Sequence, residues 1–138
     1  MAIEVVAFAH PWSTELFRRE LDHDWSTILV LVEPLAAAEG AGERIVGFVI
    51  YWLVYDEVHI LNVATHPKER RRGIARLLLE EVIARARAAN ASMLTLEARR
   101  SNEAALSLYR QAGFHAVGIR AKYYADENED AVVMTRNL

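Results

Sequence analysis

Residues 63–76 read Val-Ala-Thr-His-Pro-Lys-Glu-Arg-Arg-Arg-Gly-Ile-Ala-Arg, and the order of features in this stretch decides the fold. An apolar strand ends at about Thr65, a proline and three arginines form a turn, and a long helix begins at Gly73. Glycine lets backbone approach an anion closely, and the first N–H groups of a helix have no partner within the helix. Further positive charge comes from Arg71, Arg72 and Arg76. The stretch therefore predicts a phosphate site at a helix N-terminus.

The helix after this turn is indicated by an apolar stripe with three- and four-residue spacing. It extends from Gly73 to Ala89, and its stripe consists of Ala75, Leu78, Leu79, Val82, Ile83 and Ala86. One face of the helix should pack against the domain while its N-terminus points outward. The motif Arg-x-x-Gly-x-Ala at 70–75 is weak by itself, because a basic helix start is more often a solvated turn. The elements on either side must decide between the two interpretations.

The preceding strands predict an antiparallel meander. Apolar and β-branched runs place strands at Thr27–Val32, Arg44–Tyr55 and Val58–Ala64. The long helix then crosses to a strand at Met93–Ala98, and a connection of this length makes the two strands that it joins parallel. The sheet is therefore expected to be mixed.

Shorter elements complete the domain. A turn at Pro11-Trp12-Ser13 precedes a short helix at Thr14–Leu21. A later helix, capped by Ser101 or Asn102, continues to Ala112, and Gly113 has the residue type of a C′ cap. The last two strands are expected at Phe114–Ile119 and Ala131–Thr135. The sequence thus predicts a single α/β (α+β) domain over residues 1–138, with a mixed, mostly antiparallel sheet flanked by helices.

Composition excludes several classes of function. The chain has 138 residues, 53% of them apolar and 25% charged, which suits one globular domain. It contains no cysteine, so thiolate zinc sites and acyl-cysteine intermediates are excluded. A net charge of -3 argues against broad nucleic-acid binding, and no apolar run suggests a membrane helix. We expect a cytoplasmic monomer or weak dimer, and the histidine spacing predicts no metal site.

The whole order of elements resembles the GNAT superfamily of acetyl-CoA-dependent N-acetyltransferases. A strand ends in Glu97 after the basic turn and helix, and the next helix contains Asn102 and Tyr109. Within the superfamily the chain is most similar to RimI-type enzymes, which acetylate the N-terminal alanine of a small-subunit ribosomal protein. The likeness covers nearly the whole chain. It is carried by Pro11-Trp12-Ser13, Asn62-Val63-Ala64, Leu96-Glu97-Ala98-Arg99, Ser101-Asn102, Leu108-Tyr109, Gly113-Phe114, Tyr123-Tyr124 and Glu129-Asp130-Ala131.

The resemblance implies a co-substrate and the residues that hold it. Acetyl-CoA would bind without a metal, its pantetheine arm pairing with the backbone of 63–65 like an added strand. Contacts to it are implied for Val63, Ala64, Thr65, Arg70, Arg71, Arg72, Gly73, Ile74, Ala75, Arg76 and Asn102. The resemblance also places Ile3 to Phe8 in the family's first helix, so the strand before that helix is apparently missing. The exposed sheet edge would then need a cover, for example a second subunit.

Two catalytic roles follow from the same resemblance. Glu97 would be the general base that deprotonates the incoming ammonium, and Tyr109 would be the general acid that protonates the departing thiolate. A tyrosine phenol is protonated at neutral pH, as this role requires. Each site residue also has a structural interpretation. Tyr109 lies on an apolar helix stripe, and Asn102 is a natural helix cap.

Glu97 also has a structural interpretation, as the partner of Arg99 or Arg100 in an ion pair at the sheet edge.

Departures from the family pattern concern two loops. Arg70 and Arg72 replace residues that are often glutamine, and Ala75 replaces a frequent glycine. In the later loop, Ala121 replaces a common arginine, and residues 125–128 lack the usual proline and glycine. The cofactor is therefore indicated more specifically than the acceptor.

These observations lead to one function and two alternatives. The preferred function is transfer of acetyl from acetyl-CoA to a protein N-terminal α-amine, by direct attack in a ternary complex. The acceptor would be the N-terminal alanine of a small-subunit ribosomal protein. One alternative keeps the cofactor and changes the acceptor to a small-molecule amine or a lysine side chain. The other is a non-catalytic acyl-CoA-binding regulatory domain.

Overall fold

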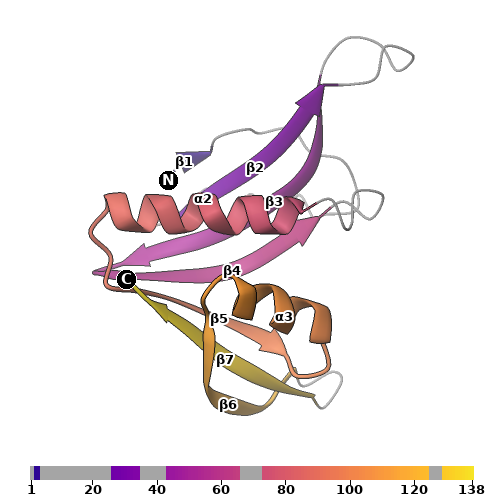
Figure 1. The fold of residues 1–138 in the computed structure, drawn as a ribbon, viewed down its shortest axis with the longest axis vertical. Helices are drawn as coiled ribbons and strands as arrows, with labels where there is room; N and C mark the ends of the chain where they lie inside the picture. The colour runs from indigo at the N-terminus through magenta and orange to yellow at the C-terminus, as the bar shows by residue number, and fades with distance from the viewer. Residues whose placement is uncertain (1, 4–25, 35–42, 66–72, 125–128) are drawn as a thin grey trace.

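A single sheet forms the frame of the structure, a computed structural model that describes residues 2–3, 26–34, 43–65, 73–124 and 129–138. The sheet has seven strands in the order β1-β2-β3-β4-β5-β7-β6 (Figure 1). Its strands are β1 Ala2–Ile3, β2 Ser26–Pro34, β3 Glu43–Val54, β4 Glu57–Thr65, β5 Met93–Arg99, β6 His115–Tyr124 and β7 Glu129–Asn137. The helices are α2 Ile74–Ala88 and α3 Glu103–Gln111. The predicted short helix at 14–21 lies outside the described residues.

The topology confirms the predicted mixed sheet. Strands β2, β3 and β4 pair antiparallel, as expected for a meander. Helix α2 connects β4 to β5, and these two strands are parallel. Strand β7 lies between β5 and β6 and pairs antiparallel with both. All predicted strands and helices within the described ranges are present, with ends that differ by a few residues.

The edge beside β2 differs from what the resemblance implied. Ala2–Ile3 forms a short strand, β1, that pairs parallel with β2 through Ala2 opposite Thr27 and Ile3 opposite Ile28. Ile3 is therefore in a strand, where the resemblance placed a helix over Ile3 to Phe8. The remaining residues of that helix lie outside the described ranges. Pairing satisfies backbone groups of β2 that an open edge would leave exposed.

Both helices pack on the same face of the sheet. Figure 1 shows α2 over the half formed by β2, β3 and β4, and α3 over the half with β5, β7 and β6. The largest core cluster joins apolar residues of both helices to alternate residues of the strands, such as Leu94 and Leu96. A smaller cluster of Ile28, Phe48 and Ile50 lies on the opposite face. Strand residues that alternate with the first cluster therefore point away from the helices.

Two glycines shape the helix ends. Gly47 of β3 allows α2 to approach closely, because a Cβ there would lie 2.7 Å from Ile74 Cγ2 and 2.9 Å from the Ala64 carbonyl oxygen. Gly113 follows α3 with φ 93, as predicted for a C′ cap. The guanidinium of Arg136 donates a hydrogen bond to the Ala112 carbonyl and so caps the end of this helix. These contacts fix both helices relative to the sheet.

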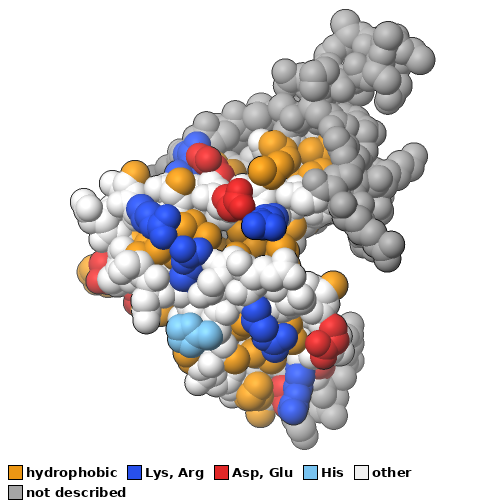
Figure 2. Space-filling model, in the orientation of Figure 1, with side chains coloured by type: hydrophobic (Ala, Val, Ile, Leu, Met, Phe, Trp, Pro, Cys, Tyr) orange, Lys and Arg blue, Asp and Glu red, His pale blue; other side chains and the backbone are white. Residues whose placement is uncertain are grey.

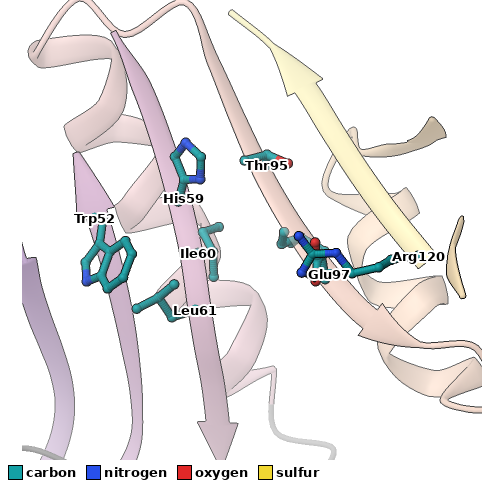
Figure 3. Close-up of a pocket in the computed structure, with 8 residues that line it drawn as sticks. Trp52, His59, Ile60, Leu61, Thr95, Glu97 and Arg120 are labelled. Atoms are coloured by element: carbon teal, nitrogen blue, oxygen red, sulfur yellow. Dashed lines mark hydrogen bonds and ion pairs between the residues drawn. The ribbon is translucent and has the colours of Figure 1, made fainter. Parts of the chain in front are cut away.

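The parallel pairing of β4 with β5 stops halfway along the strands. It covers Glu57 to Ile60 opposite Met93 to Leu96. The β3–β4 register shifts at the same level, since Tyr51 is opposite Ile60 whereas Ile50 is opposite Asn62. Leu61 is thus an extra, bulged residue, and a bulge bends and twists its strand. Beyond it β4 and β5 diverge, as Figure 3 shows, and we call the space between 62–65 and 97–99 the β4–β5 opening.

Candidate active site

The β4–β5 opening leads into a cavity of about 400 Å³ on the helix side of the sheet, which we call the helix-side cavity. Strands β4 and β5 form two of its walls, and α3 forms the third. Its lining residues are Ile60, Leu61, Asn62, Val63, Leu96, Glu97, Ala98, Arg99, Asn102, Ala105 and Tyr109. Both predicted catalytic residues, Glu97 and Tyr109, thus line one cavity together with Val63 and Asn102 from the predicted cofactor set.

A second cavity, of about 280 Å³, lies at the N-terminus of α2. This α2-end cavity is lined by Thr65, Gly73, Ile74, Ala75, Arg76, Ala104 and Leu108. Five of these seven residues belong to the predicted cofactor set, and the other two come from α3. The remaining predicted residues, Arg70, Arg71 and Arg72, lie outside the described residues. Ala64 lines neither the helix-side cavity nor the α2-end cavity, because its side chain packs with the small cluster on the opposite face.

The N-terminus of α2 has the geometry of an anion site. Gly73 is the N-cap residue, with a left-handed backbone of φ 76 and ψ 17. The Leu77 N–H donates to the Gly73 carbonyl at 3.0 Å, so the amides of 74–76 precede the regular helix bonds. Among the described residues, a Cβ at Gly73 would meet nothing within 4 Å, which on their side leaves space for a ligand to approach the backbone. The side chain of Arg76 pairs with Glu80 at 3.2 Å.

Glu97 projects from the face of β5 that is opposite the helices. Its neighbours Leu96 and Ala98 belong to the helix-side core, so the alternation of the strand directs Glu97 the other way. Its carboxylate Oε2 accepts a hydrogen bond from Arg120 Nη1 at 3.2 Å, and the Glu97 side chain is 26% exposed. Arg120 lies on β6, beyond β7. The partly exposed carboxylate can accept a proton from an amine in the cavity.

The predicted alternative partners of Glu97 pair elsewhere. Arg99 lies 3.6 Å from Glu129, and Arg100 lies 3.4 Å from Asp130. The alternative interpretation, in which Glu97 forms an ion pair with Arg99 or Arg100, is therefore wrong about the partner. The carboxylates at the start of β7 lie beside the β5–α3 turn and attract both arginines, which leaves Glu97 to Arg120.

A third cavity, of about 540 Å³, lies on the face of the sheet without α2 and α3. This open-face cavity is lined by Trp52, His59, Ile60, Leu61, Thr95, Leu96, Glu97 and Arg120 (Figure 3). Trp52, His59 and Thr95 are directly opposite one another on β3, β4 and β5. Glu97 lines both this cavity and the helix-side cavity. Glu97 therefore lies between cavities on the two faces of the sheet.

Tyr109 and Asn102 each stabilise the fold and also line the helix-side cavity. The ring of Tyr109 packs edge-to-face on Phe114, with centroids 6.1 Å apart, and the residue is half-buried. Asn102 Oδ1 accepts a hydrogen bond from the Ala105 N–H at 3.1 Å, so Asn102 is the N-cap of α3. Each residue also lines the helix-side cavity. The structural interpretation and a role in the site are thus compatible.

The start of β7 is tied to the turn between β5 and α3. Glu129 Oε1 accepts a hydrogen bond from the Ser101 N–H at 2.8 Å, and Arg99 lies 3.6 Å from the same carboxylate. The hydrogen bonds from Ser101, aided by the charge of Arg99, lower the pKa of Glu129 from its ordinary value. The Arg100 N–H also donates to the Asp130 carbonyl. These contacts hold the turn from which α3 and Asn102 begin.

The face with both helices carries charges of both signs. Figure 2 shows basic and acidic side chains intermixed there, in agreement with the Arg76–Glu80 and Arg85–Glu81 pairs on α2.

Within the described ranges, His, Cys, Asp and Glu side chains form no group of three or more that could hold a metal ion. In the same ranges, no helix is both long and apolar enough to cross a membrane.

The mixed sheet opens between the parallel strands β4 and β5, and a helix N-terminus lies at the wider end. Open strand backbone beside a helix N-terminus suits a ligand with amide and phosphate groups, as the resemblance to acetyl-CoA-dependent transferases implies. Comparison with known proteins identifies the family. The model of the acetyltransferase (GNAT) family matches residues 1–114. The chain belongs to this family.

Among its relatives is the ribosomal protein bS18-alanine N-acetyltransferase of Salmonella typhimurium. The two are 35% identical over 134 residues, which cover 96% of this chain and 84% of the relative. The crystal structure of the ribosomal-protein-S18-alanine N-acetyltransferase from Escherichia coli has a TM-score of 0.71 at 34% identity, covering 94% of this chain and 79% of that one. A GNAT family acetyltransferase from Elizabethkingia anophelis with acetyl-CoA bound has a TM-score of 0.74 at 22% identity, covering 91% and 84%, and shares the fold.

Some residues of the site were not found from the sequence. Arg120 approaches Glu97 across an intervening strand, and no local spacing relates the two positions. Leu61 causes the divergence of β4 and β5, but a bulge leaves no mark in a run of apolar residues. The sequence indicated only weakly that Trp52 and His59 line a cavity, because a polar or amphipathic residue in an apolar strand can also pack in the core.

Proposed function

We propose that this protein transfers the acetyl group of acetyl-CoA to the α-amine of a protein N-terminus. The preferred acceptor is the N-terminal alanine of a small-subunit ribosomal protein, and the reaction belongs in the cytoplasm. The observation that carries the proposal is the β4–β5 opening, in which Glu97 and Tyr109 line one cavity next to a stretch of β4 that does not pair with β5. Family membership and the names of the relatives support the same reaction.

Acetyl-CoA fits the residues along the helix side of the opening. Within the described strands, the backbone of 62–65 has no β5 partner, so its N–H and C=O groups on that side can bond the amides of a pantetheine arm. The α2-end cavity follows at Thr65, and there the amides of 74–76 and the helix dipole favour the pyrophosphate. The thioester would then lie near Glu97 and Tyr109.

The reaction is a direct transfer between two bound substrates. Glu97 accepts a proton from the acceptor ammonium, and the neutral amine attacks the thioester carbonyl carbon. The C–N bond forms, the C–S bond breaks, and Tyr109 donates its proton to the departing thiolate. The acylated nitrogen loses its second proton, which returns through water to the phenolate of Tyr109, and Glu97 releases the first proton to solvent, so that one proton is set free for each acetyl group transferred. A chain without cysteine has no thiol to carry the acetyl group, which is in keeping with a ternary complex.

The two faces of the sheet give the two substrates separate approaches. Acetyl-CoA would lie in the helix-side cavity and the acceptor in the open-face cavity, with Glu97 lining both. A cavity of about 540 Å³ is large enough to hold the first residues of an extended chain end. A protein N-terminus is such a chain end.

Turnover measured as CoA thiol release separates the candidate acceptors. Peptides with a free N-terminal alanine, the same peptides with a blocked N-terminus but a free lysine, and a panel of small amines are each offered with acetyl-CoA. We expect turnover that requires the free N-terminus. Faster turnover with small amines or with the lysine peptides would mean that the acceptor is not a protein N-terminus. Acetyl-CoA binding without turnover on any acceptor would indicate the non-catalytic alternative.

A further inference from the structure

We propose that Arg120 is a positioning residue for Glu97, a role that rests on the function proposed above. The guanidinium Nη1 of Arg120 donates to Glu97 Oε2 at 3.2 Å. This contact engages one oxygen of the carboxylate and turns the other, Oε1, into the acceptor for the substrate ammonium or for a bridging water. Arg120 does not itself exchange protons, because a guanidinium stays charged at any working pH.

The sheet geometry explains how the contact forms. In β7, Ala131 is opposite Arg120 and Val133 is opposite Glu97. Alternate residues of one strand share a face, so all four side chains belong to the face opposite α2 and α3. Through Ala131, Arg120 is level with Arg99 of β5, two residues from Glu97. The Arg120 side chain must therefore cross β7, about two strand spacings or 9 to 10 Å, and also lean along the strand to reach Glu97. Ala131, which is small and fully buried, leaves room for this crossing.

The ion pair also differs from an ordinary surface pair. The side chains of Arg120 and Glu97 are 56% and 26% exposed, whereas those of the Arg76–Glu80 pair on α2 are 62% and 57% exposed. The two pairs thus differ mainly at the carboxylate, because that of Glu97 is partly buried and is less screened by solvent. Arg120 is also the last paired residue before the second of two register shifts between β6 and β7. The ion pair therefore ties the regular end of β6 to the base.

A double-mutant cycle tests whether Arg120 acts through Glu97. In the wild-type background, Arg120→Ala should lower kcat about 10- to 100-fold through a misplaced base, with KM for acetyl-CoA unchanged. Arg120→Lys should recover part of the loss, because lysine supplies the charge without the planar fork. In the Glu97→Gln background, Arg120→Ala should cost almost nothing further. Arg85→Ala, which breaks a pair with Glu81 on α2, is the matched control and should keep wild-type turnover.

Two outcomes of the cycle would overturn the inference. A loss of equal size in both backgrounds means that Arg120 contacts the acceptor or supports the fold. Wild-type kcat in Arg120→Ala means that the base is held without it. A crystal structure of Arg120→Ala tests the contact independently of turnover, since the carboxylate of Glu97 should leave its wild-type position. An unchanged Glu97 rotamer contradicts the inference even if the proposed reaction proves wrong.

Discussion

Tyr109 combines a packing role with a chemical one, and a single substitution separates them. Its ring packs on Phe114 and the core, whereas only its hydroxyl can serve a leaving thiolate. Glu97 is the complementary residue, since it lines cavities on both faces of the sheet. At the scale of residues, the proposed chemistry therefore depends on one proton acceptor and one proton donor in the β4–β5 opening.

Tyr109→Phe should fold normally but turn over slowly. Phenylalanine keeps the ring that packs on Phe114, so the melting temperature should fall little. Loss of a general acid should lower kcat about 10²- to 10⁴-fold while acetyl-CoA affinity stays close to wild type. An acetyl donor with a more acidic thiol should shrink the deficit, because its thiolate needs less protonation. Full kcat under conditions where chemistry limits the rate would assign the acid role to another residue or to water.

Gly73→Glu should weaken acetyl-CoA binding. The new carboxylate would face the pyrophosphate at the N-terminus of α2, where space is open. Any side chain is strained at φ 76, so Gly73→Gln is the matched control with equal bulk and no charge. We expect calorimetric titration to give at least about tenfold weaker binding for the glutamate than for the glutamine variant, or about 1.4 kcal/mol. Equal affinity in the two folded variants would contradict a phosphate site at this residue.

At the scale of elements, the site depends on how α2 and α3 are seated on the sheet. Helix α2 presents its first turn to the α2-end cavity only because β3 has Gly47 beneath Ile74. Helix α3 presents Tyr109 to the helix-side cavity from a turn that Glu129 and Asp130 hold to β7. Helix propensity alone therefore does not place the first turn of α2 or Tyr109 of α3 at these cavities, since both depend on contacts with the sheet.

Gly47→Ala should shift the first turn of α2. The added Cβ would lie 2.7 Å from Ile74 Cγ2 and 2.9 Å from a backbone oxygen, so the helix must move. Overpacking of this kind costs about 1 to 3 kcal/mol, and acetyl-CoA affinity should fall as well. Gly118→Ala on β6 is the control, because its Cβ would meet nothing within 4 Å. Urea unfolding that gives both variants the same stability would show that the close approach is unimportant.

Glu129→Gln should lower stability in a pH-dependent way. Because the pKa of Glu129 is lowered in the folded state, its stabilising effect is present above the ordinary glutamate pKa and is lost as pH falls through the folded pKa. Wild type should therefore exceed the variant in unfolding free energy at pH 7, and the difference should shrink at pH 3. Urea titrations at both pH values check this expectation. A difference that is independent of pH would mean that the charge of Glu129 is not what holds the turn.

At the scale of the whole molecule, the sequence predicted the strand order within each hairpin and the crossover, because alternation and the apolar stripe of α2 are local signals. The helix N-terminus proposed to bind phosphate was predicted for the same reason, since Gly73 and the helix are contiguous. The partner of Glu97 was not, because Arg120 is two strands away and depends on the placement of β7 between β5 and β6. The bulge at Leu61 depends on strand register, which an unbroken apolar run does not specify.

The central claim is that the β4–β5 opening acetylates a chain end rather than a side chain. The free energy needed to deprotonate an α-amine is about 3 to 4 kcal/mol lower than that for a lysine ammonium. A base such as Glu97 therefore has a smaller barrier to overcome with an α-amine. The direct measurement uses a peptide with a free N-terminal alanine and one internal lysine, incubated with acetyl-CoA and analysed by fragmentation mass spectrometry. We predict acetyl on the α-amine with wild-type protein and very little with Glu97→Gln. Acetyl mainly on the lysine, or equal α-amine acetylation by the variant, would contradict the claim.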